Sequence, residues 1–219
     1  MTVVDTANDG SAVIPTIVGI EAAVARAKEV AARGPGRRVI GLAGAPGAGK
    51  STLAAELIAR VPGSALLAMD GFHLADELLE VLGRRARKGA PDTFDAAGFA
   101  SALRRIRAGE DVVVPRFDRS AEIAVAGAIR IPATAPLVIT EGNYLLLDSD
   151  GWEPVRALID ECWYVDVDDE LRRNGLVARH IDHGRSTVQA QAWVDSVDEP
   201  NARRIASTKA AADAIVQLR

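Results

Sequence analysis

A glycine-rich segment that ends in a lysine and two hydroxyl side chains is the part of this 219-residue sequence with the clearest chemical meaning. The segment GLAGAPGAGKST, residues 41–52, fits the spacing G-x-x-x-x-G-K-[ST] without a mismatch. Glycines leave backbone N–H groups free to surround an anion, and the start of a following helix adds partial positive charge. We therefore expect the segment to bind the phosphates of a nucleoside triphosphate. The expected nucleotide-binding residues are Gly44, Ala45, Pro46, Gly47, Ala48, Gly49, Lys50, Ser51 and Thr52.

Two side chains at the end of this segment have specific expected roles. Lys50 would reach the β- and γ-phosphates, where it compensates negative charge, so we count it among the catalytic residues. The Ser51 hydroxyl would hold Mg²⁺. A tight turn would also use glycines, but it would not require a lysine and a hydroxyl at this spacing.

Two acidic residues, Asp70 and Glu141, directly follow apolar runs that we interpret as strands. In open parallel sheets, ligands bind beyond the carboxyl ends of the strands. If both strands flank the strand that leads into the glycine-rich segment, both carboxylates face the γ-phosphate. Phosphoryl transfer to a hydroxyl uses a base for the acceptor proton and an acidic group for Mg²⁺ or its waters. Acids at strand ends also cap turns, but beside a phosphate-binding segment we favour the catalytic interpretation.

Arginines cluster in the segment DDELRRNGLVARHIDHGR, residues 168–185, which we predict to be a helix and its exit. Arg172 and Arg179 are seven positions apart and so share one face of that helix. One interpretation is a solvated basic face. The other is a lid that closes over the site and whose arginines neutralise the transferring phosphoryl group.

The elements that must position these residues alternate between strands and helices. The strands predicted are 39–43, 65–69, 137–140, 162–167 and 213–218, and helical patterns separate most of them. Such alternation predicts an α/β fold with a five-stranded parallel sheet covered on both faces. Thr16 is expected to cap a helix that ends near Arg33, and Asp95 to cap another that ends near Ala108. Residues 112–114 and 123–131 are expected to be extended, as in a hairpin.

The expected organisation is a loose tail over residues 1–15 and a single domain over residues 16–219. Within that domain we expect a substrate-side insertion over about residues 71–133 and the lid over about residues 168–186, because loops and insertions carry specificity.

Composition restricts the class of protein. Hydrophobic residues make up 48% of the chain, and the net charge of −4 argues against a general nucleic-acid surface. The single cysteine, Cys162, lies in an apolar run, where we expect it to pack in the core rather than react. No apolar run is long enough for a membrane span, and the first residues lack the features of a signal peptide. We therefore expect a cytoplasmic protein with no nucleic-acid or membrane partner.

An ordered set of short motifs accompanies the glycine-rich segment: MDGFH at 69–73, RKGAPDTFD at 87–95, PRFDR at 115–119, TEGNYLL at 140–146 and DEPNA at 198–202. With this set the chain resembles the phosphoribulokinase/uridine kinase group of P-loop kinases, which includes bacterial pantothenate kinases. It is most similar to bacterial kinase-like proteins named after fructose transport systems. The likeness extends from about Arg38 to the end of the chain.

The resemblance implies a three-layer P-loop NTPase fold, ATP and Mg²⁺ as cofactors, and a small molecule with a hydroxyl as the acceptor. By position, Asp70 matches the catalytic base of the group and Glu141 its magnesium-associated carboxylate. Arg172 and Arg179 match its lid arginines. The acceptor-binding positions implied are Phe72, His73, Phe94 and Asp95.

Three acceptor classes stay open: a nucleoside, a sugar, or a pantothenate-like alcohol. A homodimer is also possible. Uridine kinases of the group carry a histidine near the position of Phe117, but here Arg119, Ser120 and Ala121 follow Phe117-Asp118. Two other functions also stay open. One is a kinase that acts on a phosphate, like nucleoside monophosphate kinases, and the other is a regulatory P-loop ATPase without an acceptor.

Overall fold

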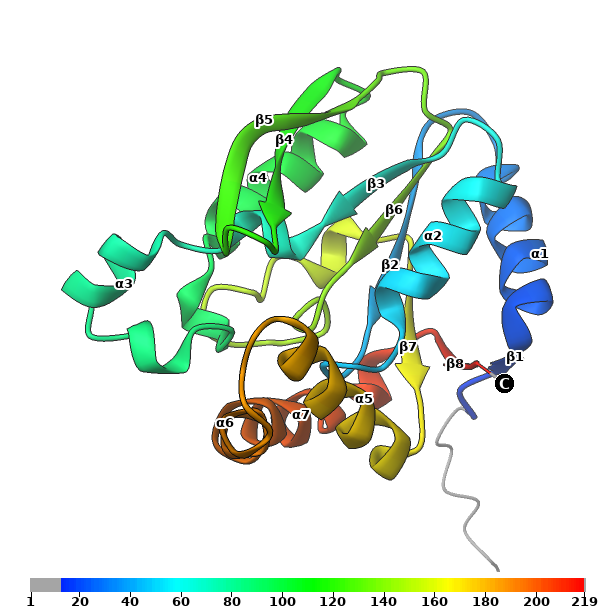
Figure 1. Ribbon diagram of the computed structural model, residues 1–219. Helices are drawn as coiled ribbons and strands as arrows, with labels where there is room; N and C mark the ends of the chain where they lie inside the picture. The colour runs from blue at the N-terminus through cyan, green and yellow to red at the C-terminus, as the bar shows by residue number, and fades with distance from the viewer. Residues whose placement is uncertain (1–12, 219) are drawn as a thin grey trace, which may run out of the picture.

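The computed structural model describes residues 13–218, so most of the expected tail, residues 1–12, lies outside the described residues. A six-stranded parallel sheet forms the centre of the molecule, with strand order β1-β8-β7-β2-β6-β3 (Figure 1). The strands are β1 (Thr16–Val18), β2 (Arg38–Ala43), β3 (Ala65–Ala68), β6 (Leu137–Glu141), β7 (Glu161–Asp166) and β8 (Ala214–Gln217).

Alternate residues of the central strands enter two separate hydrophobic cores. On β2, Val39 belongs to one core, while Ile40 and Leu42 belong to the other. β7 behaves likewise, with Cys162 on one face and Trp163 on the other. Successive side chains of a strand point to opposite faces, so continuous apolar runs such as these indicate a sheet covered on both sides.

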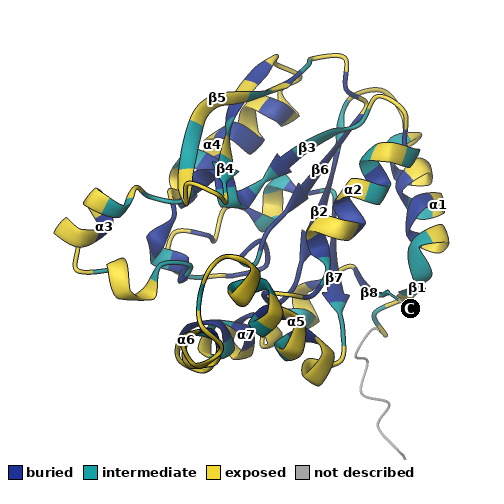
Figure 2. Ribbon diagram, viewed as in Figure 1, coloured by how far each residue is buried: buried dark blue, intermediate teal, exposed yellow. Residues whose placement is uncertain are grey.

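Helices cover the two faces. α1 (Gly19–Ala31) and α2 (Lys50–Arg60) pack side by side on one face. α4 (Ala96–Arg107) packs on the other, with Phe99 and Leu103 fully buried. Figure 2 shows the strands mostly buried and the outer faces of these helices exposed. The layering is therefore helix, sheet, helix, as the sequence predicts.

Two further groups of elements lie outside these layers: one is at the carboxyl ends of the strands, and the other lies beside β3, with the tip of its hairpin toward the same end. α5 (Asp169–Asp182), α6 (Thr187–Trp193), a single π-helical turn (Val194–Asp198) and α7 (Glu199–Ala206) lie below the sheet in Figure 1. The other group holds the short helix α3 (Asp76–Val81) and an antiparallel hairpin of β4 (Val112–Asp118) and β5 (Ile123–Ile131). The expected extended pieces thus form a hairpin, and Asp95 caps α4 as expected.

Three details of the expected fold are wrong. The sheet has six strands because Thr16, expected to begin a helix, instead begins β1, which pairs with β8. α1 therefore starts at Gly19. Moreover, β3 does not flank β2: β6 lies between them. The register pairs Ala68 of β3 and Leu42 of β2 with Glu141 of β6, so the three strands still end at the same level.

Candidate active site

The glycine-rich segment forms the loop between β2 and α2, and close packing explains its glycines. Gly44, Gly47 and Gly49 have φ of 149°, 79° and 86°, which favour glycine. A Cβ at Gly44 would lie 2.7 Å from the Val165 carbonyl oxygen, and one at Gly47 would lie 2.8 Å from Cγ of Leu176. The loop is therefore held between β7 and the helix α5.

Lys50 begins α2 and folds back over this loop. Its side chain is buried, and Nζ donates to the carbonyl oxygens of Gly44 and Ala45, both at 2.9 Å. Burial lowers the pKa of Lys50 to about 8, while Glu141 and Asp70 favour its charged form. A desolvated ammonium group bound only to carbonyl oxygens suits the later approach of a phosphate.

Glu141 ends β6 beside the start of α2, and the Ser51 hydroxyl donates to its Oε1 at 3.3 Å. Burial raises the pKa of Glu141, and the neighbouring Asp70 adds to this effect, whereas Lys50 opposes it. Nowhere in residues 13–218 do three His, Cys, Asp or Glu side chains form a group able to hold a metal ion. One carboxylate and one hydroxyl fit Mg²⁺, which takes few protein oxygens and completes its shell with phosphates and water.

Asp70 lies in the short helix that follows β3, and glycines allow it to approach Glu141. The residue after each acid is a glycine. A Cβ at Gly71 would lie 2.4 Å from the Pro115 carbonyl oxygen, and one at Gly142 would lie 2.5 Å from Cβ of Met69. These glycines let the ends of β3 and β6 and the strand β4 pack closely, which brings the hairpin to the same place as the two acids.

A cavity of about 610 Å³ is lined by the phosphate-binding loop, Asp70, the hairpin and residues from α5 to α7. His73, Phe94 and Phe117 form an aromatic group in it, with the ring of His73 4.0 Å from that of Phe94 and 4.6 Å from that of Phe117. Burial lowers the pKa of His73, so this imidazole is neutral at pH 7. The cavity thus has a phosphate-binding end and an aromatic end, with Asp70 between them.

Arg179 of α5 lines the same cavity. The described residues provide no hydrogen bond or ion pair for its guanidinium, which is largely desolvated. Burial lowers the pKa of Arg179, and the nearby Arg119 adds to the effect. A half-buried cation that the described residues leave unpaired suits an anionic ligand, such as a nucleotide phosphate.

Gly44 and Ala45 begin the loop outside the cavity lining, and three expected residues from other segments do not line the cavity either. Arg172 points instead to the other side of the loop, where its guanidinium binds Glu199 at 2.5 Å and Asp169 at 3.0 Å. Phe72 packs edge-on against Phe99 in the core. Asp95 is exposed and accepts from the Gly98 N–H at 2.8 Å as the cap of α4.

These placements have simple causes. Arg172 and Arg179 lie seven positions apart on α5. Arg172 faces α7 and the phosphate-binding loop, whereas Arg179 faces the cavity. The Asp95 carboxylate is used by the helix N-terminus, which leaves Phe94 as the part of the Phe-Asp pair that reaches the cavity. Of the expected site residues outside the loop, the structure brings together Asp70, His73, Phe94, Glu141 and Arg179.

Sequence reasoning assigned no roles to Lys88, Phe117 and Arg119, which also line the cavity. Arg119 forms an ion pair with Asp70, and Lys88 Nζ lies 5.5 Å from the centre of the Phe117 ring. Lys88 belongs to the motif RKGAPDTFD, and Phe117 and Arg119 belong to the motif PRFDR. Nothing in the sequence indicates that these two motifs lie next to each other in the structure.

A phosphate-binding loop at the carboxyl end of a central parallel strand, facing a carboxylate on the neighbouring strand, defines the P-loop class of nucleotide-binding proteins. Within this class, the chain belongs to the Phosphoribulokinase / Uridine kinase family, which matches residues 39–219. It is therefore a P-loop kinase that acts on small molecules.

Relatives and solved structures agree with this placement. The chain is 36% identical to "Uncharacterized protein YggC" of Escherichia coli over 83% of its own length and 78% of the relative's. It is 33% identical to "Putative uridine kinase C227.14" of Schizosaccharomyces pombe, over 71% of this chain and 72% of the relative. A crystal structure described as a "putative fructose transport system kinase", from Silicibacter sp. TM1040, superposes with a TM-score of 0.79 at 39% identity, covering 88% of this chain and 98% of the other.

The described residues 13–218 contain no helix that is both long and apolar enough to cross a membrane.

Proposed function

We propose that this kinase transfers the γ-phosphoryl group of ATP to a hydroxyl group of a small molecule. The observation that carries the proposal is the position of Asp70, which is near Lys50 and Glu141 and whose carbonyl oxygen lies 2.8 Å from Nδ1 of His73 in the aromatic group. A hydroxyl bound against the aromatic residues has a carboxylate next to it on the side that faces the nucleotide.

In this reaction Asp70 accepts the proton of the acceptor hydroxyl as its oxygen forms the new bond to phosphorus. The bond between the γ-phosphorus and the β–γ bridging oxygen breaks, and its electrons stay with the departing ADP. Lys50 and Arg179 compensate the charge on the transferring group and the leaving phosphate. Phosphoryl transfer transition states are loose, so the proton of the acceptor hydroxyl moves late in the reaction.

Ser51 and Glu141 would hold Mg²⁺, which neutralises charge on the β- and γ-phosphates when bound. The role of the protein here is positioning: β6 presents Glu141, and the first turn of α2 presents Ser51. The hydrogen bond from the Ser51 hydroxyl to Glu141 Oε1 supports this assignment.

The test is an ATP-consumption screen with nucleosides, sugars and pantothenate-like alcohols, with Asp70→Asn as the control. We expect one class to stimulate ADP formation in the wild type and not in the variant. ATP hydrolysis that no alcohol changes would favour a regulatory ATPase instead.

Phosphoryl transfer onto a phosphate is the second candidate function, because cations at the aromatic end of the cavity would also suit an acceptor phosphate. Such a reaction does not need a base, since a phosphate oxygen is already ionised. Full activity of Asp70→Asn would favour it.

A further inference from the structure

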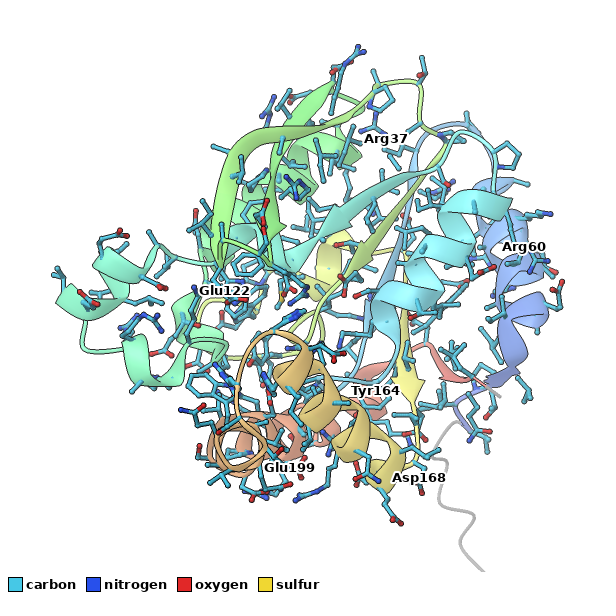
Figure 3. The ribbon with its side chains drawn as sticks, in the orientation of Figure 1. Arg37, Arg60, Glu122, Tyr164, Asp168 and Glu199 are labelled. Atoms are coloured by element: carbon cyan, nitrogen blue, oxygen red, sulfur yellow. The ribbon has the colours of Figure 1, made fainter. Side chains whose placement is uncertain are left out.

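Two cations from different parts of the chain meet at the aromatic end of the cavity. Lys88 follows the short helix Arg85–Arg87, and Arg119 follows β4 at the tip of the hairpin. Both approach the ring of Phe117, with Nζ of Lys88 at 5.5 Å and Cζ of Arg119 at 5.9 Å from its centre. In Figure 1 the segment that carries α3 lies beside the lower end of the hairpin of β4 and β5. Figure 3 labels Glu122 at this end of the hairpin.

The protein fixes Lys88 firmly in this place. Its side chain is only 9% exposed, and Nζ donates to Asp76 Oδ1 at 2.7 Å and to the Glu122 carbonyl oxygen at 2.8 Å. Asp76 also pairs with Arg85, another residue of the cavity wall. One carboxylate is therefore shared by two cations, Lys88 and Arg85. Burial of a lysine costs free energy unless its charge is used.

Arg119 is placed beside the proposed base. One of its nitrogens donates to Asp70 Oδ2, and its side chain is 47% exposed in the cavity. A guanidinium has five N–H donors in a planar fork, so one arginine can bind Asp70 and a second anion together. An anionic group bound by the free donors of Arg119 would be only a few covalent bonds away from a hydroxyl of the same molecule that contacts Asp70.

We propose that the phosphoryl acceptor carries an anionic group, a carboxylate or a phosphate ester, close to its reacting hydroxyl, and that Lys88 and Arg119 bind this group. The inference rests on the proposed function and narrows its acceptor from any small alcohol to a small hydroxylated anion. The Glu122 carboxylate, which also lines the cavity, suits further hydroxyls of the same molecule.

The test uses acceptor pairs that share a hydroxylated skeleton but differ in charge: glycerate and glycerol, gluconate and glucose, fructose 6-phosphate and fructose. ADP formation is measured for the wild type, Arg119→Gln and Lys88→Met. Arg116→Gln is the matched control, because Arg116 lies on β4 three positions before Arg119, pairs with Asp118 and does not line the cavity. We expect the anionic member of at least one pair to be used about 10-fold or more better, and the preference to be lost in the two variants but not in the control.

A binding measurement tests the anion-binding role of Lys88 and Arg119 even when the enzyme phosphorylates none of these acceptors. With the nonhydrolysable ATP analogue AMP-PNP and Mg²⁺ present, calorimetry should detect glycerate or fructose 6-phosphate in the wild type and in Arg116→Gln. Arg119→Gln should weaken this binding about 10-fold, while its affinity for AMP-PNP stays unchanged.

The carboxylate and phosphate probes identify which anion the cations prefer. Normal AMP-PNP binding together with no anion binding, or with equal use of neutral and anionic acceptors, overturns this inference and leaves the kinase assignment intact. Failure of the wild type to bind AMP-PNP overturns the proposed function itself.

Discussion

At the scale of single residues, Asp70 is the group on which the proposed chemistry depends. An alcohol does not ionise at neutral pH, so loss of the base affects the chemical step most. We expect Asp70→Asn to lower kcat about 10²–10⁴-fold with little change in the KM for ATP. Steady-state kinetics at saturating acceptor measures both. A variant with unchanged kcat and a raised KM for the acceptor would make Asp70 a binding residue.

Lys50 illustrates how a residue proposed to act in catalysis can reduce stability. Burial lowers the pKa of Lys50 in the folded protein from the ordinary lysine value of 10.5 to about 8, so the unfolded chain binds the extra proton more tightly. The contribution of Lys50 to the free energy of unfolding therefore rises as the pH increases from about 8 to about 10.5. At pH 7 the charged lysine costs stability.

We expect Lys50→Met to have a higher Tm at pH 7 than the wild type, and turnover reduced by orders of magnitude. The difference in stability between the two should shrink as pH rises through this window, because the wild type then loses its buried charge. Urea unfolding at pH 7 and pH 10 measures it. An equal or lower stability of Lys50→Met at pH 7 would show that the hydrogen bonds to Gly44 and Ala45 outweigh burial.

At the scale of elements, the helix α5 carries three arginines that lie in different environments. Arg172 is 2% exposed and paired with Glu199, so Arg172→Ala should destabilise the fold by about 3 kcal/mol because it leaves a buried charge. Arg173→Ala, at a site 40% exposed, should cost less than about 1 kcal/mol. Urea unfolding distinguishes them.

Arg179→Ala should instead leave stability nearly unchanged and lower kcat more than it weakens ATP binding, because its guanidinium faces the cavity. Pre-steady-state turnover and AMP-PNP titration give the two quantities. Equal losses in both would make Arg179 a ground-state binder of the nucleotide rather than a residue that acts in the transition state.

The turn after β3 has little room for any side chain at Gly71. Gly71→Ala places a methyl group 2.4 Å from the Pro115 carbonyl oxygen, so we expect β4 to move and stability to fall by about 1–3 kcal/mol. Gly175→Ala is the control: this helical glycine has open space around its Cβ position, and alanine there should raise stability by up to about 1 kcal/mol. A similar urea midpoint for Gly71→Ala and the wild type would contradict the packing described here.

At the scale of the whole molecule, much of the arrangement could be predicted because it depends on local patterns. The buried strands have continuous apolar runs, and the phosphate-binding loop has a spacing that few other structures require. Cys162 is buried, as the apolar run around it predicts, and burial raises the pKa of its thiol to about 12.

The rest depends on contacts between distant segments. The pairing of Thr16 with β8 cannot be read from a three-residue strand, and the order of β3 and β6 is a matter of topology rather than pattern. The ion pair of Arg119 with Asp70 joins residues 49 positions apart. Equal spacing also hides the different environments of Arg172 and Arg179, since helical periodicity predicts a shared face but not which neighbour each side chain meets.

The identity of the phosphorylated product tests the central claim most directly. Once an acceptor stimulates ADP formation, ³¹P NMR of the product distinguishes a phosphate monoester from a phosphoanhydride. We predict a monoester, formed by the wild type and not by Asp70→Asn over the same time. A phosphoanhydride, or inorganic phosphate as the only product, would contradict transfer to a hydroxyl.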